Sequence, residues 1–378
     1  MKFVLAPDSF KESMTAKEVA DAMERGIKKI IPEAECIKVP MADGGEGTTQ
    51  SLVDATGGEI HLVDVRGPLG EKVESKIGIL GDGETAVIEM ADASGLQLIS
   101  KEDRDPLLTT TFGTGELILN ALEKGVKHLL IGIGGSATND GGAGMFQALG
   151  GKLLDIEGRE LPPGGGFLGS LHKIDISSLD SRLKDVSVEV ACDVNNPLTG
   201  LTGASHIFGP QKGAVPEVVE RLDKNLVHYA AIIREQLGIE VETIAGAGAA
   251  GGLGAGLMAF LDAQLVRGID LVIAHTGLEE ATSHADYVLT GEGSIDAQTL
   301  YGKTPIGVSK LAKKYGVPTI VLAGSLGGGV DILYDHGITA IFNILQTPCE
   351  LDIALETGLI NVEKTSENIA RLLRLNNI

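Results

Sequence analysis

Short apolar segments that end in loops rich in aspartate and glycine occur at both ends of this chain. They restrict the fold more than any other feature. At the N-terminus, the apolar run 3–6 precedes a loop over 7–14, and Thr15 and Glu18 then form a capping-box pattern. Apolar residues at helical spacing follow, and a second apolar run covers 35–39. This order predicts a strand, a helix and a second, parallel strand.

The C-terminal part repeats this pattern. Apolar runs at 286–290, 318–323 and 339–344 predict three strands, and 306–315 predicts a helix whose first position is Pro305. The two ends of the chain thus supply five short strands. We predict that they form one doubly wound, Rossmann-like parallel sheet.

The middle of the chain has a different pattern. Residues 59–90 alternate between polar and apolar residues and contain turn residues at 67–68 and 81–83, which predicts antiparallel hairpins. A helix at 115–124 and strands at 128–133 and 186–191 follow.

The expected fold class is therefore α/β, with a doubly wound Rossmann-like parallel-sheet domain into which a second, mixed α/β domain is inserted. Residues 1–66 and 270–378 are expected to form the first domain and 67–269 the inserted one, with the active site in the cleft between them.

Charge and cysteine content exclude several classes of function. The formal net charge is -21, which argues against nucleic acid and anionic membranes as partners. An anionic substrate would need local positive charge, backbone N–H groups or a metal ion. Cys36, Cys192 and Cys349 are odd in number and far apart, and no signal peptide or long apolar run is present, so a cytoplasmic location is expected.

The segment 297–304 resembles a Walker A loop with Ala297 in place of the first glycine. A true P-loop follows its strand almost directly, whereas the predicted strand ends near Thr290. Leu300 and Tyr301 are also bulky where a phosphate-wrapping backbone needs small residues. The segment is therefore not expected to be a P-loop.

This segment still carries groups suited to phosphoryl transfer. Glu292, Asp296 and Lys303 follow a parallel strand, at the edge of the sheet where ligands bind. Carboxylates for Mg²⁺ and a lysine for phosphate are the residue types that this chemistry uses. The alternative is a solvated loop with helix caps. Thr304 is expected to do no more than cap the next helix.

Two further strands end in loops of this kind. Asp8 and Lys11 follow the first strand, where Asp8 is a candidate base or metal ligand and Lys11 a candidate clamp for carboxylate or phosphate. An ordinary turn is the alternative. Asp43 follows the second strand as a candidate ligand for a metal or a hydroxyl group, and Gly44 and Gly45 allow the backbone to approach a ligand.

The central segment offers three more candidates. Gly134, Gly135 and Ser136 follow an apolar strand and are expected to form an anion-binding nest. Asp193 ends another strand as a candidate metal or substrate ligand, and Lys212 lies among turn residues.

A dinucleotide-like glycine pattern occurs at Gly246, Gly248 and Gly251. The preceding 240–244 is a poor buried strand, and Asp270 lies at the start of the next predicted strand rather than at its end. We therefore expect a helix that packs closely against a neighbour and not a dinucleotide site.

Several long segments together resemble the bacterial glycerate kinase family. They are "APDSFK", "MADGGEGT", "IGIGGSATNDGGAGM", "IFGPQKGA", "GAGAAGGLGAGLMAFL" and "LTGEGSIDAQTLYGKTPIGV". The resemblance covers nearly the whole chain and implies two α/β domains with a cleft between them. It also implies ATP- and Mg²⁺-dependent phosphorylation of D-glycerate, at the 2-hydroxyl to give 2-phosphoglycerate or, alternatively, at the 3-hydroxyl to give 3-phosphoglycerate.

The resemblance also suggests roles for the candidate residues. Asp8, Asp43 and Asp193 are assigned to base and Mg²⁺ roles, with Asp193 and Glu292 as metal ligands. The phosphates are expected near Lys11, Lys303 and the 134–136 loop, with Lys212 and Asp296 in the wider binding site.

Two residues depart from the family pattern. Ser294 stands where many relatives have arginine, and Phe112 stands where arginine or tyrosine is common. Either Arg104 or Lys303 supplies the charge that Ser294 lacks, or the substrate preference differs. The alternative function classes are a nicotinamide-dependent oxidoreductase of small hydroxy acids and a non-catalytic metabolite sensor. Formation of a homodimer is left open.

Overall fold

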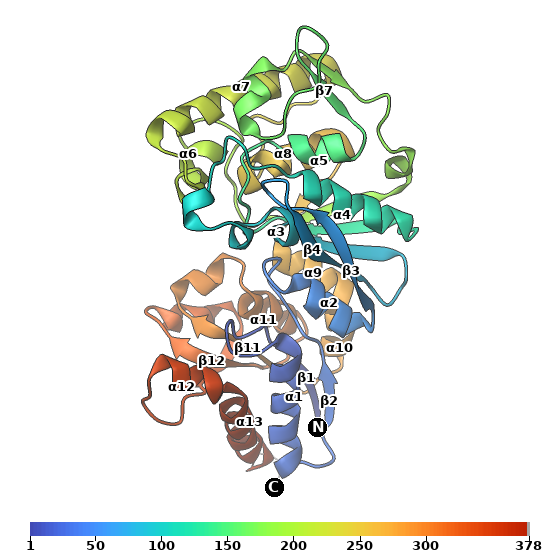
Figure 1. Cartoon of the computed structure of the whole chain (residues 1–378). Coiled ribbons are helices and arrows are strands. Elements are labelled where there is room, and N and C mark those ends of the chain that lie inside the picture. Colours follow the sequence, from blue (N-terminus) through green and yellow to red (C-terminus); the bar gives the residue numbers. More distant parts are fainter. Residues whose placement is uncertain (376–378) are drawn as a thin grey trace. The chain divides into compact units, whose positions relative to one another are not determined.

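The chain divides into two compact units in the computed structural model, which describes residues 1–375 (Figure 1). Unit 1 contains residues 1–43, 50–57 and those from 268 onward, and unit 2 contains 44–49 and 58–267. The predicted boundary at residue 66 does not coincide with this division. Strand β3 (Glu59–Arg66) pairs along its whole length with β4 (Lys72–Ile79) of unit 2, so its ladder belongs to that unit.

Unit 1 holds a five-stranded sheet in which every neighbouring pair is parallel. The strands, in the order in which they lie in the sheet, are β13 (Ile338–Asn343), β12 (Thr319–Leu326), β11 (Tyr287–Ile295), β1 (Lys2–Leu5) and β2 (Glu35–Lys38). Counted along the chain from the β2 edge, this is the doubly wound order 2-1-3-4-5. The predicted parallel sheet from both chain ends is confirmed.

The strand order reverses between β1 and β11. The chain first steps from β1 to β2 on one side, and it later continues from β11 to β12 and β13 on the other. The loops that leave β1 and β11 therefore diverge at their carboxyl ends. Open α/β sheets bind their ligands at this switch point.

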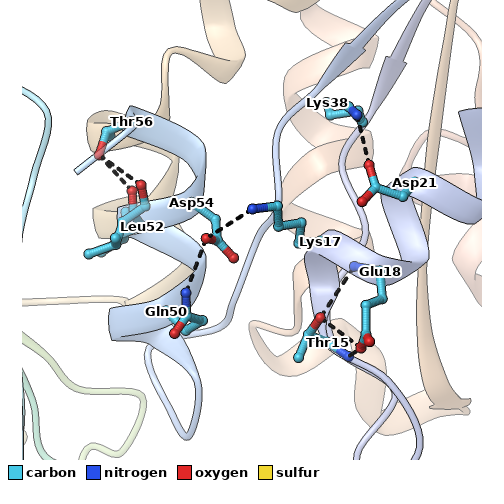
Figure 2. A network of polar contacts seen from close by, with 10 residues as sticks. Thr15, Lys17, Glu18, Asp21, Lys38, Gln50, Leu52, Asp54 and Thr56 are labelled. Atoms are coloured by element: carbon cyan, nitrogen blue, oxygen red, sulfur yellow. Dashed lines mark hydrogen bonds and ion pairs between the residues drawn. The ribbon is translucent and has the colours of Figure 1, made fainter. Parts of the chain in front are cut away.

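Helix α1 (Ala16–Ile30) begins with the predicted capping box. Figure 2 shows Thr15 and Glu18 facing each other, with Thr15 Oγ1 accepting from Glu18 N at 3.2 Å and the Glu18 carboxylate accepting from Thr15 N at 2.9 Å. Two further contacts in Figure 2 are Lys38 with Asp21 at 2.7 Å and Lys17 with Asp54 at 3.7 Å. These exposed pairs contribute little stability by themselves.

Helix α13 (Gly358–Leu375) packs directly against α1. A Cβ atom built on Gly26 of α1 would lie 2.2 Å from the carbonyl oxygen of Glu363, so only glycine permits this approach. The other helices of unit 1 are α2 (Thr48–Thr56), α9 (Gly268–Thr276), α10 (Leu278–Ser283), α11 (Thr304–Lys314) and α12 (Leu351–Glu356), with short 3₁₀ turns η6 (Ala297–Tyr301) and η7 (Val330–His336).

Two sequence predictions in unit 1 are wrong. Strand β11 does not end near Thr290 but continues to Ile295, because its ladder with β12 extends through polar residues that interrupt the apolar signal. The strand predicted after residue 270 is helix α9. A short apolar run fits either a buried strand or a buried helix, and periodicity does not separate the two.

Unit 2 contains a mixed six-stranded sheet. In sheet order its strands are β10 (Gln264–Val266), β9 (Ser187–Ala191), β6 (His128–Gly132), β5 (Thr85–Glu89), β4 (Lys72–Ile79) and β3. The β3–β4 and β4–β5 pairs are antiparallel, as predicted, and the others are parallel.

The helices around this sheet are α3 (Ala91–Ser94), α4 (Phe112–Glu123), α5 (Ala143–Ala148), α6 (Ala204–Phe208), α7 (Pro216–Leu237) and α8 (Ala249–Leu261), and β7 (Lys152–Leu154) pairs with β8 (Lys173–Asp175). Within residues 1–375, every helix is too short or too polar to cross a bilayer.

The glycines at 246–252 serve close packing. Helix α8 is kinked where Gly251 takes a φ of +66°, and a Cβ atom on Gly251 would lie 1.9 Å from the carbonyl oxygen of Thr138. A Cβ atom on Gly248 would lie 2.1 Å from that of Pro197. The segment 240–244 is not a strand. The dinucleotide-like pattern thus reflects contacts inside unit 2.

Candidate active site

A cavity of about 570 Å³ opens in unit 1 where the loops after β1 and β11 diverge. It brings together the predicted site residues Asp8, Lys11, Asp43, Glu292 and Lys303. The other walls come from the ends of β11 and β12, from the loop after β13, and from α12. A volume of this size is typical of small-molecule sites.

Asp8 is held rigidly at the polar end of this cavity. Its backbone N–H donates to the carbonyl oxygen of Gly291 on β11 at 2.9 Å, which continues the β1–β11 pairing. Its Oδ1 accepts from Ser9 N at 2.6 Å, and its Oδ2 accepts from the hydroxyl of Thr304 at 2.6 Å. The backbone of Asp8 is therefore fixed by β11, and its carboxylate is positioned by its own loop and by Thr304.

Glu292 lies on β11 beside Lys303. Lys303 Nζ donates to Glu292 Oε1 at 2.9 Å and to the carbonyl oxygen of Ser294 at 3.3 Å. Glu292 is buried, whereas the Lys303 side chain is 36% exposed. This ion pair brings a positive charge next to Ser294, which stands where the family pattern has an arginine.

The electrostatics of the cavity favour protonation of its acids. Burial, together with the charge of Asp43, raises the pKa of Asp8 to about 6. Burial also raises the pKa of Glu292 to about 7, against the opposing effect of Lys303, and Asp8 and Asp43 add to the rise. Carboxylates with a pKa near neutrality inside a cavity are suited to accepting a proton from a substrate.

Lys11 lies on the loop between β1 and α1. The loop is closed by reciprocal backbone hydrogen bonds between Phe10 and Met14, and Ser13 Oγ donates to the carbonyl oxygen of Leu355 on α12 at 2.6 Å. Lys11 itself is exposed and lines the cavity. Its charge is thus available to a ligand.

Two predictions for the segment 292–304 need correction. The expectation that Thr304 only caps a helix is wrong, because its buried hydroxyl donates to Asp8. No sequence signal pairs residues so distant in the chain. Asp296 is not part of the cavity lining. Its carboxylate caps η6 by accepting from Gln298 N at 2.8 Å, which was the alternative reading.

Unit 2 brings a second group of predicted residues together. Lys212, which is 1% exposed, donates to Ser136 Oγ and to the carbonyl oxygen of Thr138, both at 2.7 Å. Burial lowers the pKa of Lys212 to about 7, and Asp140 opposes this. Gly134 and Gly135 are exposed just before Ser136.

Arg104 lies next to this group. Its Nη1 donates to the carbonyl oxygen of Gln211 at 3.1 Å, and its backbone oxygen lies so near Gly213 that a Cβ atom there would be 2.4 Å away.

Phe112, the second residue that departs from the family pattern, has a cationic partner. The guanidinium of Arg66 lies 4.1 Å from the centre of its ring.

The loop with Gly44 and Gly45 is anchored by a residue that sequence reasoning missed. Buried Glu89 of β5 accepts from Gly47 N at 3.2 Å and from Thr49 N at 2.8 Å. Gly44 has a φ of +91°, which favours glycine, and Gly45 O accepts from the Thr48 hydroxyl at 2.7 Å. A carboxylate at the end of a buried strand was the available signal.

The predicted metal ligands Asp193 and Glu292 belong to different units. Asp193 is exposed after β9, and a metal site shared with Glu292 stays a prediction. Within residues 1–375, no group of three or more His, Cys, Asp or Glu side chains is arranged to hold a metal ion. The donor chemistry of Asp8, Asp43 and Glu292 nevertheless suits a hard cation such as Mg²⁺.

The fold and cavity define a doubly wound α/β protein with a cavity of small-molecule size at the switch point of its sheet. A model of the Glycerate kinase family matches residues 3–374, and the chain belongs to this family.

Similar proteins are known from several bacteria. The "Glycerate 2-kinase" of Escherichia coli and the "Glycerate kinase" of Bacillus subtilis are each 55% identical over 375 residues, covering 99% of this chain and 98% of the relative. The crystal structure of a putative glycerate kinase 2 from Salmonella typhimurium LT2 superimposes with a TM-score of 0.93 at 53% identity, over 100% of this chain and 99% of that one.

Proposed function

We propose that this chain transfers the terminal phosphoryl group of ATP to the 2-hydroxyl of D-glycerate, giving 2-phosphoglycerate and ADP. The observation that carries the proposal is the unit 1 cavity, in which Asp8, Asp43 and Glu292 lie with Lys11 and Lys303 at the switch point of the sheet. Family membership and the name of the Escherichia coli relative support the substrate and the position of transfer.

Asp8 is the proposed base. The hydroxyl oxygen of glycerate forms a bond to the terminal phosphorus, the bond from this phosphorus to its bridging oxygen breaks, and Asp8 takes the hydroxyl proton. With a pKa of about 6, Asp8 is ionised at neutral pH and yet more basic than an ordinary aspartate. Lys11 and Lys303 would neutralise phosphate charge that the transition state spreads over oxygen atoms.

Mg²⁺ is part of the proposal. Asp43 and Glu292 would hold it in unit 1, because the negative charge of Asp43 raises the pKa of Glu292 and a nearby cation would relieve this repulsion. When bound, the ion would neutralise charge on the phosphates. Asp193 remains a predicted further ligand.

The group around Lys212 in unit 2 is proposed to bind an anionic part of the substrates. Lys212 and Arg104 supply positive charge, and Gly134, Gly135 and Ser136 supply backbone and hydroxyl donors. Three further predictions stay open: an active site in a cleft, a homodimer and a cytoplasmic location. The last rests on three cysteines that form no disulfide.

ADP release tests the activity directly. Purified protein with ATP, Mg²⁺ and D-glycerate should release ADP. The same mixture with an excess of chelator should show no turnover, and a mixture with NAD in place of ATP should show none either. Phosphorus NMR of the product identifies the hydroxyl that was phosphorylated. A product with the phosphate on the 3-hydroxyl would overturn the assigned position, and glycerate-dependent reduction of NAD would favour the oxidoreductase alternative.

A further inference from the structure

The unit 1 cavity has a second, apolar end that the proposed chemistry does not use. Its wall contains Met14, Ile344, Leu345, Leu351 and Leu355. Glycerate carries an oxygen on each of its three carbons and offers no apolar face to such a wall. A three-carbon acid is also small for a volume of about 570 Å³, which is typical of larger ligands.

The apolar wall is tightly attached to unit 1. Ile344 is 2% exposed, and its N–H donates to the carbonyl oxygen of Ala323 on β12 at 2.9 Å. A Cβ atom on Gly358 would lie 2.1 Å from Met14 Cε, so the start of α13 contacts the wall directly. The bond from Ser13 to Leu355 joins the β1 loop to α12. The wall is therefore preformed and does not depend on a ligand for its shape.

The residues between the two ends are small. Gly293 and Ser294 on β11 and Gly324 and Ser325 on β12 also line the cavity. In the sheet, β12 lies between β11, which carries Glu292, and β13, which ends just before Ile344. Glycines there let the backbone approach a ligand closely, and Lys303 lies beside Ser294. An elongated ligand with one apolar and one phosphorylated end fits this order of groups.

We propose that the apolar end of the unit 1 cavity binds the adenine ring of ATP, with the phosphates extending past the strand ends toward Lys303. This inference rests on the proposed function for the identity of the nucleotide. A purine has two flat, largely apolar faces, which partly exposed aliphatic side chains such as Leu345 and Leu355 can cover. The inference assigns the base to unit 1.

Cys349 provides a direct probe, because it is exposed and lines the cavity near the apolar wall. Burial raises the pKa of Cys36 to about 11 and also raises the pKa of the half-buried Cys192, so both thiols react slowly. Alkylation by iodoacetamide, located by peptide mass spectrometry, therefore reports on Cys349.

The ligands to compare are ADP, AMP, inorganic tripolyphosphate and D-glycerate. ADP and AMP at ten times their dissociation constants should slow alkylation of Cys349 by about tenfold, because only the unliganded fraction reacts. Tripolyphosphate and D-glycerate should leave the rate nearly unchanged. Protection by D-glycerate or tripolyphosphate without protection by AMP would overturn the inference.

A pair of variants on α12 gives an independent test. Ala354→Phe places a ring in the cavity, and Ile353→Phe is the matched control because Ile353 is 50% exposed and does not line it. Ala354→Phe should weaken ADP binding by about tenfold or more, while the control binds normally. Melting temperatures show whether both variants fold.

The failure of this inference is distinguishable from failure of the proposed function. Normal phosphorylation of glycerate, with no protection of Cys349 and normal nucleotide affinity in a folded Ala354→Phe variant, would reject the adenine site alone. Protection by AMP without any phosphorylation of glycerate would leave the site in place and reject the proposed reaction.

Discussion

The hydroxyl of Thr304 donates a 2.6 Å hydrogen bond to Asp8 Oδ2, although the two residues are 296 positions apart in the chain. Both are buried, and they come from the loop after β1 and from the start of α11. This bond favours the charged form of the carboxylate and limits the rise in its pKa that burial causes. Thr304 is therefore a positioning residue for the proposed base.

Replacing this hydroxyl should shift the pH dependence of activity. Thr304→Val removes the donor to Asp8 Oδ2 and leaves only the bonds from Ser9 to Oδ1. The pKa of Asp8 should therefore rise by about one to two units, given about 1.5–3 kcal/mol for a hydrogen bond to a charged group. The acidic limb of the kcat/KM profile should move up accordingly, and activity should recover at alkaline pH. Thr304→Ser should retain the original profile. An unshifted limb in a folded Thr304→Val variant would remove Thr304 from this role.

Replacing Asp8 should separate activity from stability. Because the folded pKa of Asp8 is raised from 3.8 to about 6, its contribution to stability is greatest at low pH and is lost as the pH rises from about 4 to about 6. Asp8→Asn should therefore stabilise the fold at pH 8, by on the order of 1–3 kcal/mol, and should give no such gain near pH 4. Its turnover should fall by about 10²–10⁴-fold.

Denaturant unfolding at the two pH values checks this stability prediction, and ADP release checks turnover. Asp54→Asn is a suitable control, because this partly buried carboxylate is paired with Lys17 and lies in unit 1 outside the cavity lining. Equal stability changes at pH 4 and pH 8 would contradict the assignment of a raised pKa to Asp8.

Replacing Lys303 and Glu292 together should restore stability that is lost when Lys303 is replaced alone, but it should not restore activity. Lys303→Met leaves a buried carboxylate without its partner and should destabilise unit 1 by about 1–3 kcal/mol, less than for a fully buried pair because Lys303 is 36% exposed. Glu292→Gln added to this variant should recover most of the loss. Both single variants and the double variant should have strongly reduced turnover. Additive losses of stability in the double variant would show that the pair does not interact.

Lys11 should matter for turnover and not for stability. Its side chain is exposed at the cavity, so Lys11→Ala removes charge from the site without disturbing the core. Turnover should fall by at least about tenfold at an unchanged melting temperature, because phosphate charge would be left unneutralised. Lys17→Ala, an exposed lysine on α1 paired with Asp54, is the matched control and should behave like the unmodified protein. Equal kinetics in the two variants would exclude Lys11 from the site.

Much of the fold of unit 1 was predictable because its signals are local. The apolar runs and the Thr15–Glu18 capping box depend on neighbours within a few residues, and all five predicted strands are present in one parallel sheet. The positions of Asp8 and Asp43 after strands followed from the same pattern, whereas Glu292 lies within β11 and not after it. The polar end of β11 was missed because pairing with β12 extends it, and the helix at 268–276 was missed because a short apolar run fits either a strand or a helix.

By itself, the sequence determined the five strands of the parallel sheet in unit 1 and that the candidate residues Asp8 and Asp43 follow two of them, since strand positions and residue types are local properties. Tertiary structure alone decided that Thr304 bonds Asp8, that Asp296 caps η6 instead of lining the cavity, and that Lys303 pairs with Glu292. It also decided the raised pKa of Asp8 and Glu292. These properties depend on burial and on distances between segments far apart in the chain, and only the packed fold sets both.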